Sequence, residues 1–195
     1  MQGVQAMNRM PVSPAPWDAW NIATFLRIHA TASSPHWLVV LAVALATLPL
    51  YAAFVLTGWQ IVHQRERRTA AWLVLALALA LGIEALVSAF AFHPRPFAAG
   101  FGPAWMQHAA SNSMPSTHVT LALTMALVVG LGRHYATSLA LLVMGALMAW
   151  ARVYVGVHWP ADMIGAAISA SLSSALAYVL LGRRVAATST PSSTS

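Results

Sequence analysis

The sequence of 195 residues contains no cysteine and no lysine. Without cysteine, the chain has no disulfide bonds, no thiolate catalysis and no cysteine-based zinc or iron–sulfur site. Only 7% of the residues are charged and only four are acidic, whereas a soluble domain carries about 25% charged residues. This shortage of charge excludes an ordinary soluble domain.

Apolar residues make up 59% of the chain, and the mean hydropathy is +0.68. These values are typical of an integral membrane protein. The net charge of +6 comes from ten basic residues, all arginine, which are scattered singly or in small clusters. Membrane topology and anionic headgroups explain such a distribution, so we expect no nucleic-acid partner.

Five apolar runs have lengths close to the 20 or so residues that a transmembrane helix needs. They occupy residues 37–62, 69–92, 117–131, 135–153 and 161–181. The sequence therefore predicts an all-α, polytopic membrane helix bundle, formed by a single domain over residues 17–185. We expect residues 1–16 and 186–195 to be disordered tails.

Residues 17–32 differ from these runs because polar residues interrupt their apolar pattern. The apolar residues of this segment recur at mixed helical spacings, and they are interrupted by Asp18, Asn21, Arg27 and His29. We expect an amphipathic helix that lies on the membrane surface, with a short sixth span as the alternative.

The arginines also predict the orientation of the five spans, because cytoplasmic loops are enriched in arginine and lysine. Residues 63–68, Arg133 and the pair 183–184 fall on one side of the membrane when the spans are counted. We expect that side to be cytoplasmic. Three polar segments between the apolar runs then lie together on the extracytoplasmic side.

The most informative of these segments contains Arg152, His158 and Asp162 at a membrane boundary, where ionisable groups usually have a function. Pro160 favours the first turn of a helix, so Asp162 would lie one turn beyond His158. Its carboxylate would hold one imidazole nitrogen and leave the other nucleophilic, while Arg152 would bind phosphate oxygens. The alternative is an interfacial ion pair that anchors helix ends.

Two shorter segments add to this pattern. Ser116 is a natural N-cap for the run that begins at Thr117, where unpaired backbone N–H groups would bind an anion, and His118 would act as a proton donor. Arg95, which Pro96 follows directly, is a further phosphate ligand in this interpretation. Each segment alone would also suit an ordinary cap or interfacial anchor.

Together, these segments resemble the three motifs of the type 2 phosphatidic acid phosphatase superfamily, over residues of about 69–181. Arg152, His158 and Asp162 match the third motif, with Ala151 in place of its serine. Residues 115–118 match Pro-Ser-Gly-His, with Thr117 in place of glycine, and residues 95–96 match the end of Lys-x6-Arg-Pro, with Ser88 in place of lysine.

The resemblance implies a lipid phosphatase in which His158 is the nucleophile, Asp162 orients it and His118 is the general acid and base. Arg95, Arg152, Ser116 and Thr117 would bind phosphate. Further candidates for the site are His93, Ser88 and the intramembrane Glu84. We expect no metal and no cofactor, since arginines and a helix terminus would supply the positive charge and no His-x3-His pair is present.

The small size and the segment 93–97 are most similar to the undecaprenyl diphosphate phosphatase branch. This similarity implies hydrolysis of undecaprenyl diphosphate at the periplasmic side of a bacterial inner (cytoplasmic) membrane. Phosphatidic acid, phosphatidylglycerol phosphate and lipid A phosphates are alternative substrates. An anionic-lipid transporter or binding protein is the alternative of another class, and the sequence leaves the oligomeric state open.

Overall fold

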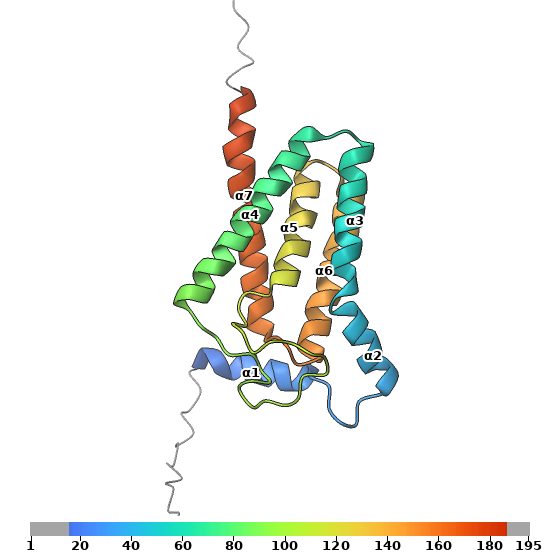
Figure 1. Ribbon diagram of the computed structural model, residues 1–195, viewed down its shortest axis with the longest axis vertical. Helices are drawn as coiled ribbons and strands as arrows, with labels where there is room; N and C mark the ends of the chain where they lie inside the picture. The colour runs from blue at the N-terminus through green and yellow to red at the C-terminus, as the bar shows by residue number, and fades with distance from the viewer. Residues whose placement is uncertain (1–15, 187–195) are drawn as a thin grey trace, which may run out of the picture.

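The computed structural model describes residues 16–186, and every regular element in that range is a helix. The elements are α1 (Pro16–Ile28), α2 (His36–Leu45), α3 (Leu48–His63), α4 (Arg67–Phe90), α5 (Thr117–Leu131), α6 (Tyr135–Tyr154) and α7 (Pro160–Ala186). The predicted all-α membrane bundle is therefore confirmed (Figure 1). Residues 1–15 and 187–195, nearly all of the two predicted tails, lie outside the described range.

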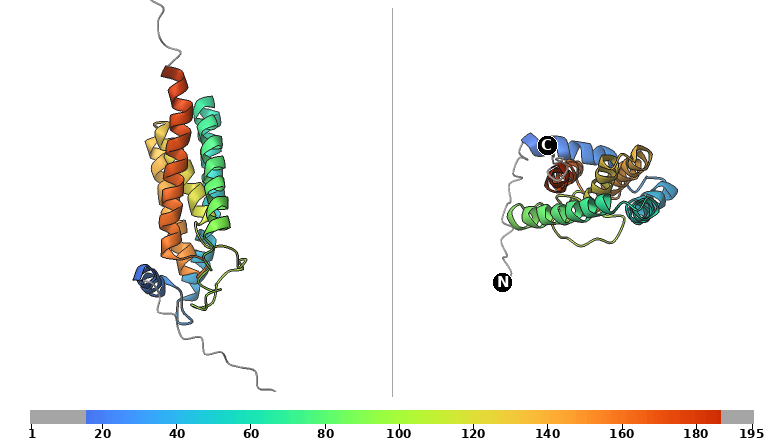
Figure 2. Two further views of the ribbon diagram at one scale, coloured as in Figure 1. Left: turned by 90° about the vertical axis from the view of Figure 1, so that its left-hand side faces the viewer. Right: turned by 90° about the horizontal axis from the view of Figure 1, so that it is seen from above.

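The long helices run side by side along the bundle (Figures 1 and 2). Four segments are long and apolar enough to cross a membrane, namely His36–His63, Arg67–Phe90, Tyr135–Tyr154 and Pro160–Leu181, and α5 is a shorter apolar helix. The predicted spans agree with these elements to two residues or fewer at each end.

The first span is broken, which the sequence analysis did not predict. α2 ends at Leu45 and α3 begins at Leu48. Pro49 lies in the first turn of α3, where its missing N–H is tolerated. At the break, Leu50 N–H bonds the carbonyl of Thr47 at 3.1 Å instead of that of Ala46. The Ala46 carbonyl is therefore left for a partner outside the helix.

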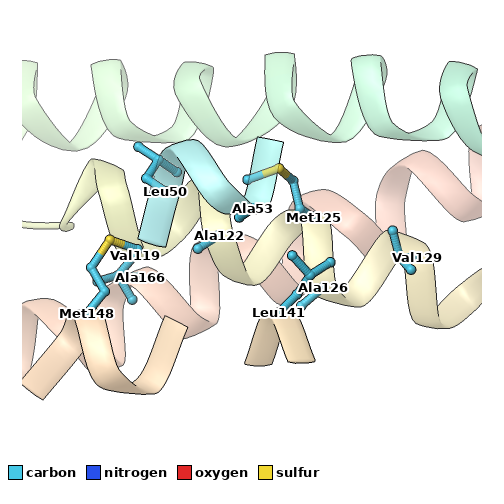
Figure 3. Packing of buried hydrophobic residues seen from close by; sticks show 10 residues of the cluster. All are labelled: Leu50, Ala53, Val119, Ala122, Met125, Ala126, Val129, Leu141, Met148 and Ala166. Atoms are coloured by element: carbon cyan, nitrogen blue, oxygen red, sulfur yellow. The ribbon is translucent and has the colours of Figure 1, made fainter. Parts of the chain in front are cut away.

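The central helix is α5, which contacts α3, α4, α6 and α7. Its 15 residues span about 22 Å at 1.5 Å per residue, less than the hydrocarbon thickness of about 30 Å. Small and medium apolar side chains let its neighbours approach closely. Figure 3 shows this core: Leu50, Ala53, Val119, Ala122, Met125, Ala126, Val129, Leu141, Met148 and Ala166.

Helix α1 lies across one end of the bundle, roughly perpendicular to the long helices (Figures 1 and 2). This orientation matches the predicted surface helix and not a sixth span. Asn21 is buried, and its side-chain oxygen accepts the Ala161 N–H at 2.9 Å. Phe25 packs against Trp159 with ring centroids 5.0 Å apart. Helix α1 therefore buttresses the turn between α6 and α7.

Candidate active site

The three predicted segments meet at the end of the bundle that α1 crosses. The loop over residues 91–116, the start of α5 and the turn between α6 and α7 all lie there (Figure 1). Arg95, Arg152, His158 and Asp162 are buried. Residues that are far apart in the sequence thus form one compact polar cluster beside an apolar core.

The centre of the cluster is the pair His158 and Asp162. Pro160 begins α7, and Asp162 follows in its first turn, so its carboxylate reaches back to the His158 Nδ1 at 3.0 Å. The same Asp162 oxygen accepts the backbone N–H of Trp159 at 2.8 Å and the hydroxyl of Ser113. A carboxylate held by these donors fixes the imidazole so that Nδ1 carries the proton and Nε2 has the free lone pair.

Two guanidinium groups converge on that second nitrogen. The Arg95 Nη1 lies 2.9 Å and the Arg152 Nη2 3.3 Å from the Nε2 of His158. Burial, together with the charges of Arg152 and Arg95, lowers the pKa of His158 to about 3 in spite of the opposing effect of Asp162. The imidazole is therefore neutral at physiological pH, as a nucleophile must be.

Backbone carbonyls hold both arginines in place. Arg95 donates to the carbonyls of Val157 at 2.9 Å and Asn112 at 3.0 Å. Arg152 donates to the Ala46 carbonyl at 2.9 Å, the carbonyl that the break in the first span leaves unpaired. Burial lowers the pKa of Arg95, but arginine remains charged at neutral pH. The Nε groups of both arginines are buried and have no acceptor among residues 16–186.

The start of α5 lies against this cluster. His118, in its first turn, is half-buried and lies close enough to Arg152, His108 and Arg95 to feel their charges. Ser116 is at the N-cap as predicted, but its side chain makes no capping hydrogen bond. The Ser116 hydroxyl is instead buried without a partner in the described part of the chain. It is thus available to a ligand.

Two of the three departures from the family motifs, Thr117 and Ser88, lie where α4 approaches α5 and the loop. The Thr117 hydroxyl donates to Glu84, whose other carboxylate oxygen is buried and has no partner among the described residues. Ser88 is exposed and accepts the side-chain amide of Asn112 at 3.3 Å. Ser88 therefore bonds the loop and makes no hydrogen bond with either arginine, whereas Glu84 is close enough to act on the charge of Arg95.

The loop also contributes His108, Asn112 and Ser113, which the sequence motifs did not identify. His108 Nε2 lies 3.0 Å from Arg152 Nη2, and Ser113 is completely buried against Asp162. Asn112 accepts the His93 N–H at 2.7 Å, and His93 Nδ1 lies 3.8 Å from Asp162. The buried carboxylate and guanidiniums draw these polar loop residues inward. The only available signal was the polar triplet 111–113 shortly before Pro115.

Among residues 16–186, no group of three histidine, aspartate or glutamate side chains is arranged to hold a metal ion. The concentrated charge is instead that of two guanidiniums around one neutral imidazole nitrogen. Such a site can bind a phosphate through planar, bidentate hydrogen bonds and present a nucleophile to its phosphorus.

Comparisons with known proteins agree with this geometry. The family model described as the PAP2 superfamily matches residues 69–186. The chain is 34% identical over 169 residues to "Putative undecaprenyl-diphosphatase YbjG" of Escherichia coli (strain K12). This alignment covers 82% of each chain. The chain is also 31% identical over 120 residues to "Undecaprenyl-diphosphatase BcrC" of Bacillus subtilis (strain 168), and this alignment covers 62% of each chain.

Two crystal structures share the fold. LpxE of Aquifex aeolicus superposes with a TM-score of 0.70 at 23% identity, over 82% of this chain and 95% of that one. A PAP2-type phosphatidylglycerolphosphate phosphatase from Bacillus subtilis gives a TM-score of 0.65 at 17% identity, over 90% and 89% of the two chains. These findings define a membrane-embedded hydrolase that acts on lipid phosphates. The chain belongs to the PAP2 superfamily.

Proposed function

We propose that this protein hydrolyses undecaprenyl diphosphate to undecaprenyl phosphate through a phosphohistidine intermediate. The convergence of two guanidiniums on the Nε2 of His158, whose Nδ1 is bonded to a buried carboxylate, carries the proposal. The names of the two similar proteins both contain undecaprenyl-diphosphatase, which supports this choice of substrate.

In the first step the terminal phosphate takes the place of the His158 imidazole as acceptor for the guanidiniums of Arg95 and Arg152. The His158 Nε2 attacks phosphorus, and the bond from phosphorus to the bridging oxygen breaks. His118 donates a proton to the departing lipid phosphate. Asp162 stabilises the imidazolium that carries the phosphoryl group.

In the second step water attacks the phosphohistidine and gives its proton to His118, which restores the general acid. The bond between phosphorus and the His158 Nε2 breaks, and inorganic phosphate leaves. The charge that develops on the equatorial oxygens dominates the transition state. Its partners are the two guanidiniums, the free Ser116 hydroxyl and the N–H groups that begin α5, including that of Thr117.

The departures from the family motifs bear on the headgroup. With Ser88 in place of lysine, Arg95 and Arg152 supply the main positive charge, and Glu84 places a carboxyl group beside the phosphate site. The hydrogen bond from Thr117 engages one Glu84 oxygen. This pair therefore contributes to the choice among phosphates, and His93 supports Asp162 from the side of the loop.

We place this site on the periplasmic side of a bacterial inner membrane. The support is the arginine distribution: Arg65, Arg67, Arg68 and Arg133 all lie at the opposite end of the bundle. Cysteine at the exposed Ala99 should react with an impermeant maleimide added to intact cells, whereas cysteine at Gln64 should react only after lysis. The reverse pattern would overturn the orientation.

Phosphate release by detergent-purified protein, with EDTA present, tests the function. Undecaprenyl diphosphate and phosphatidic acid are assayed in parallel, for the wild type and for His158→Ala. We expect rapid release from the diphosphate that EDTA does not inhibit and that requires His158. A clear preference for phosphatidic acid would reject the proposed substrate, and full activity in the variant would reject the nucleophile.

A further inference from the structure

A pocket of about 410 Å³ lies at the end of the bundle opposite His158, between the α3–α4 turn and the α5–α6 turn. Four arginines line it: Arg65, Arg67, Arg68 and Arg133. It is separate from the candidate active site, so its role does not depend on the proposed reaction. Figure 1 shows the two turns side by side.

These four guanidiniums have no acidic partner among the described residues. All four arginines are exposed, and no arginine–carboxylate ion pair occurs among residues 18–181, whose side chains the structure describes. The one carboxylate at the pocket, that of Glu66, is bonded to His134 at 2.6 Å and to the hydroxyl of Thr69 at 2.5 Å. Glu66 supplies one negative charge against four guanidiniums, so the pocket keeps a net positive charge.

The two turns share a backbone arrangement that brings arginine to the pocket. Arg65 and Arg133 have φ values of 54° and 69°, and they are the only non-glycine residues with positive φ in the described range. Each directly follows a helix C-cap, where glycine is the usual residue. Gly132 permits close packing, since a Cβ there would lie 3.1 Å from the Thr69 hydroxyl. Helix termination alone would favour glycine at both positions, so it does not explain why both are arginine.

The buried wall of the pocket supplies an independent observation. Trp72 lines the pocket and is only 6% exposed, yet its indole N–H has no acceptor among residues 16–186. The Arg68 guanidinium lies 4.7 Å above the same ring. A buried donor without a partner in the described part of the chain, beside four guanidiniums without an acidic partner there, indicates that an anionic acceptor completes the pocket.

The general enrichment of arginine in cytoplasmic loops requires only that the charges lie on one side. It explains neither their convergence on one pocket nor the unpaired donor of Trp72. We propose that this pocket binds the phosphate group of an anionic lipid headgroup, in the leaflet opposite the active site. A lipid fits better than free phosphate because the side chain of Leu131, 40% exposed, forms an apolar wall of the pocket.

Thermal unfolding in detergent micelles tests the proposal, because a ligand that binds the folded state raises Tm. Phosphatidylglycerol is titrated into the full-length protein, with phosphatidylcholine and inorganic phosphate as separate probes. We expect phosphatidylglycerol alone to raise Tm strongly. In Arg68→Gln/Arg133→Gln, the concentration for half the effect should rise at least about tenfold, as for loss of charge-assisted hydrogen bonds. Trp72→Phe, which keeps an aromatic ring, should weaken the effect less.

The matched control is Arg183→Gln/Arg184→Gln, which removes the same charge from the last turns of α7. It should respond to phosphatidylglycerol as the wild type does. An equal loss of response in both double variants would show that only net charge matters and would overturn the pocket. A shift with inorganic phosphate but not with the lipid would overturn the headgroup assignment. The active site is identical in all variants, so any binding there cancels.

Discussion

A closely spaced histidine–carboxylate pair lies at each end of the bundle. His158 and Asp162 are separated by 3.0 Å, and His134 and Glu66 by 2.6 Å. By distance alone the second pair resembles a catalytic dyad more than the first. The environments differ, however: the first pair is almost completely buried, whereas the side chains of the second are 22% and 28% exposed.

The decisive difference is the partner of the second imidazole nitrogen. In His134 the side-chain amide of Gln60 occupies Nδ1 at 3.0 Å, so both nitrogens are engaged. In His158 the Nε2 faces two guanidiniums, which a phosphate can take over as ligands. A histidine–carboxylate pair therefore does not itself indicate catalysis. The second nitrogen must face a site that binds the substrate.

The largest expected effect comes from removing each histidine in turn. His158→Ala should lower kcat by at least about four orders of magnitude, because it removes the proposed nucleophile. His134→Ala should retain near-wild-type kcat and lose only thermal stability. Phosphate release and Tm, measured on the same preparations, distinguish the two. Comparable losses of kcat would remove the basis of the comparison.

The carboxylates should follow the same division, with a smaller effect. Asp162→Asn should lower kcat about 10³- to 10⁴-fold, because an amide can stabilise the wrong tautomer and cannot balance the imidazolium. Glu66→Gln should leave kcat unchanged and cost about 1 kcal/mol of unfolding free energy, as for one hydrogen bond. If Asp162→Asn keeps wild-type kcat, the proposed orienting role of Asp162 is rejected.

Replacing arginine by lysine keeps the charge and removes the planar guanidinium. The replacement should therefore affect activity at the candidate active site but not at the opposite end of the bundle. Arg152→Lys should reduce kcat/KM about 10- to 100-fold, because an ammonium group cannot donate to the Ala46 carbonyl and to the phosphate in one plane, as the guanidinium can. Arg68→Lys should leave kcat/KM unchanged. Steady-state kinetics with the diphosphate measure both, and an active Arg152→Lys would mean that charge alone suffices.

The pH dependence of stability should also reflect the buried pair. The pKa of His158 is lowered to about 3 by burial, so between about pH 6.5 and 3 the unfolded state binds more protons there than the folded state. The unfolding free energy should therefore fall as pH falls through this range, by at most about 1.4 kcal/mol per unit. His158→Asn should show a weaker dependence in denaturation at pH 4 to 7. An identical slope would contradict the buried, neutral imidazole.

Much of the fold and part of the site followed from the sequence because their signals are local. Apolar length alone predicted the spans, and the i, i+4 spacing with Pro160 correctly predicted the bond between His158 and Asp162. The arginine count placed all three polar segments at one end, which the structure confirms. Catalytic roles for these residues remain predictions.

The parts that escaped prediction depend on contacts distant in sequence. The role of the Ala46 carbonyl requires a helix break whose only local sign is Pro49, and its partner Arg152 lies 106 residues away. Ser113 and His108 are polar loop residues whose burial is decided by Asp162 and Arg152. Single-sequence patterns carry no information on such pairings, and the same is true of the arginine pocket.

The smallest expected effect concerns the turn after α5, at the end of the bundle opposite His158. Arg133 occupies a left-handed position in which its N–H bonds the Gly130 carbonyl at 2.9 Å and the next N–H, of His134, bonds that of Val129 at 3.2 Å. Glycine adopts this conformation without the Cβ penalty, so Arg133→Gly should raise the unfolding free energy by about 1 kcal/mol in lipid-free detergent. Activity at the far end should not change. A loss of stability in lipid-free detergent would show that the arginine side chain supports the turn itself. The expected gain would mean that arginine at this position lowers the stability of the protein.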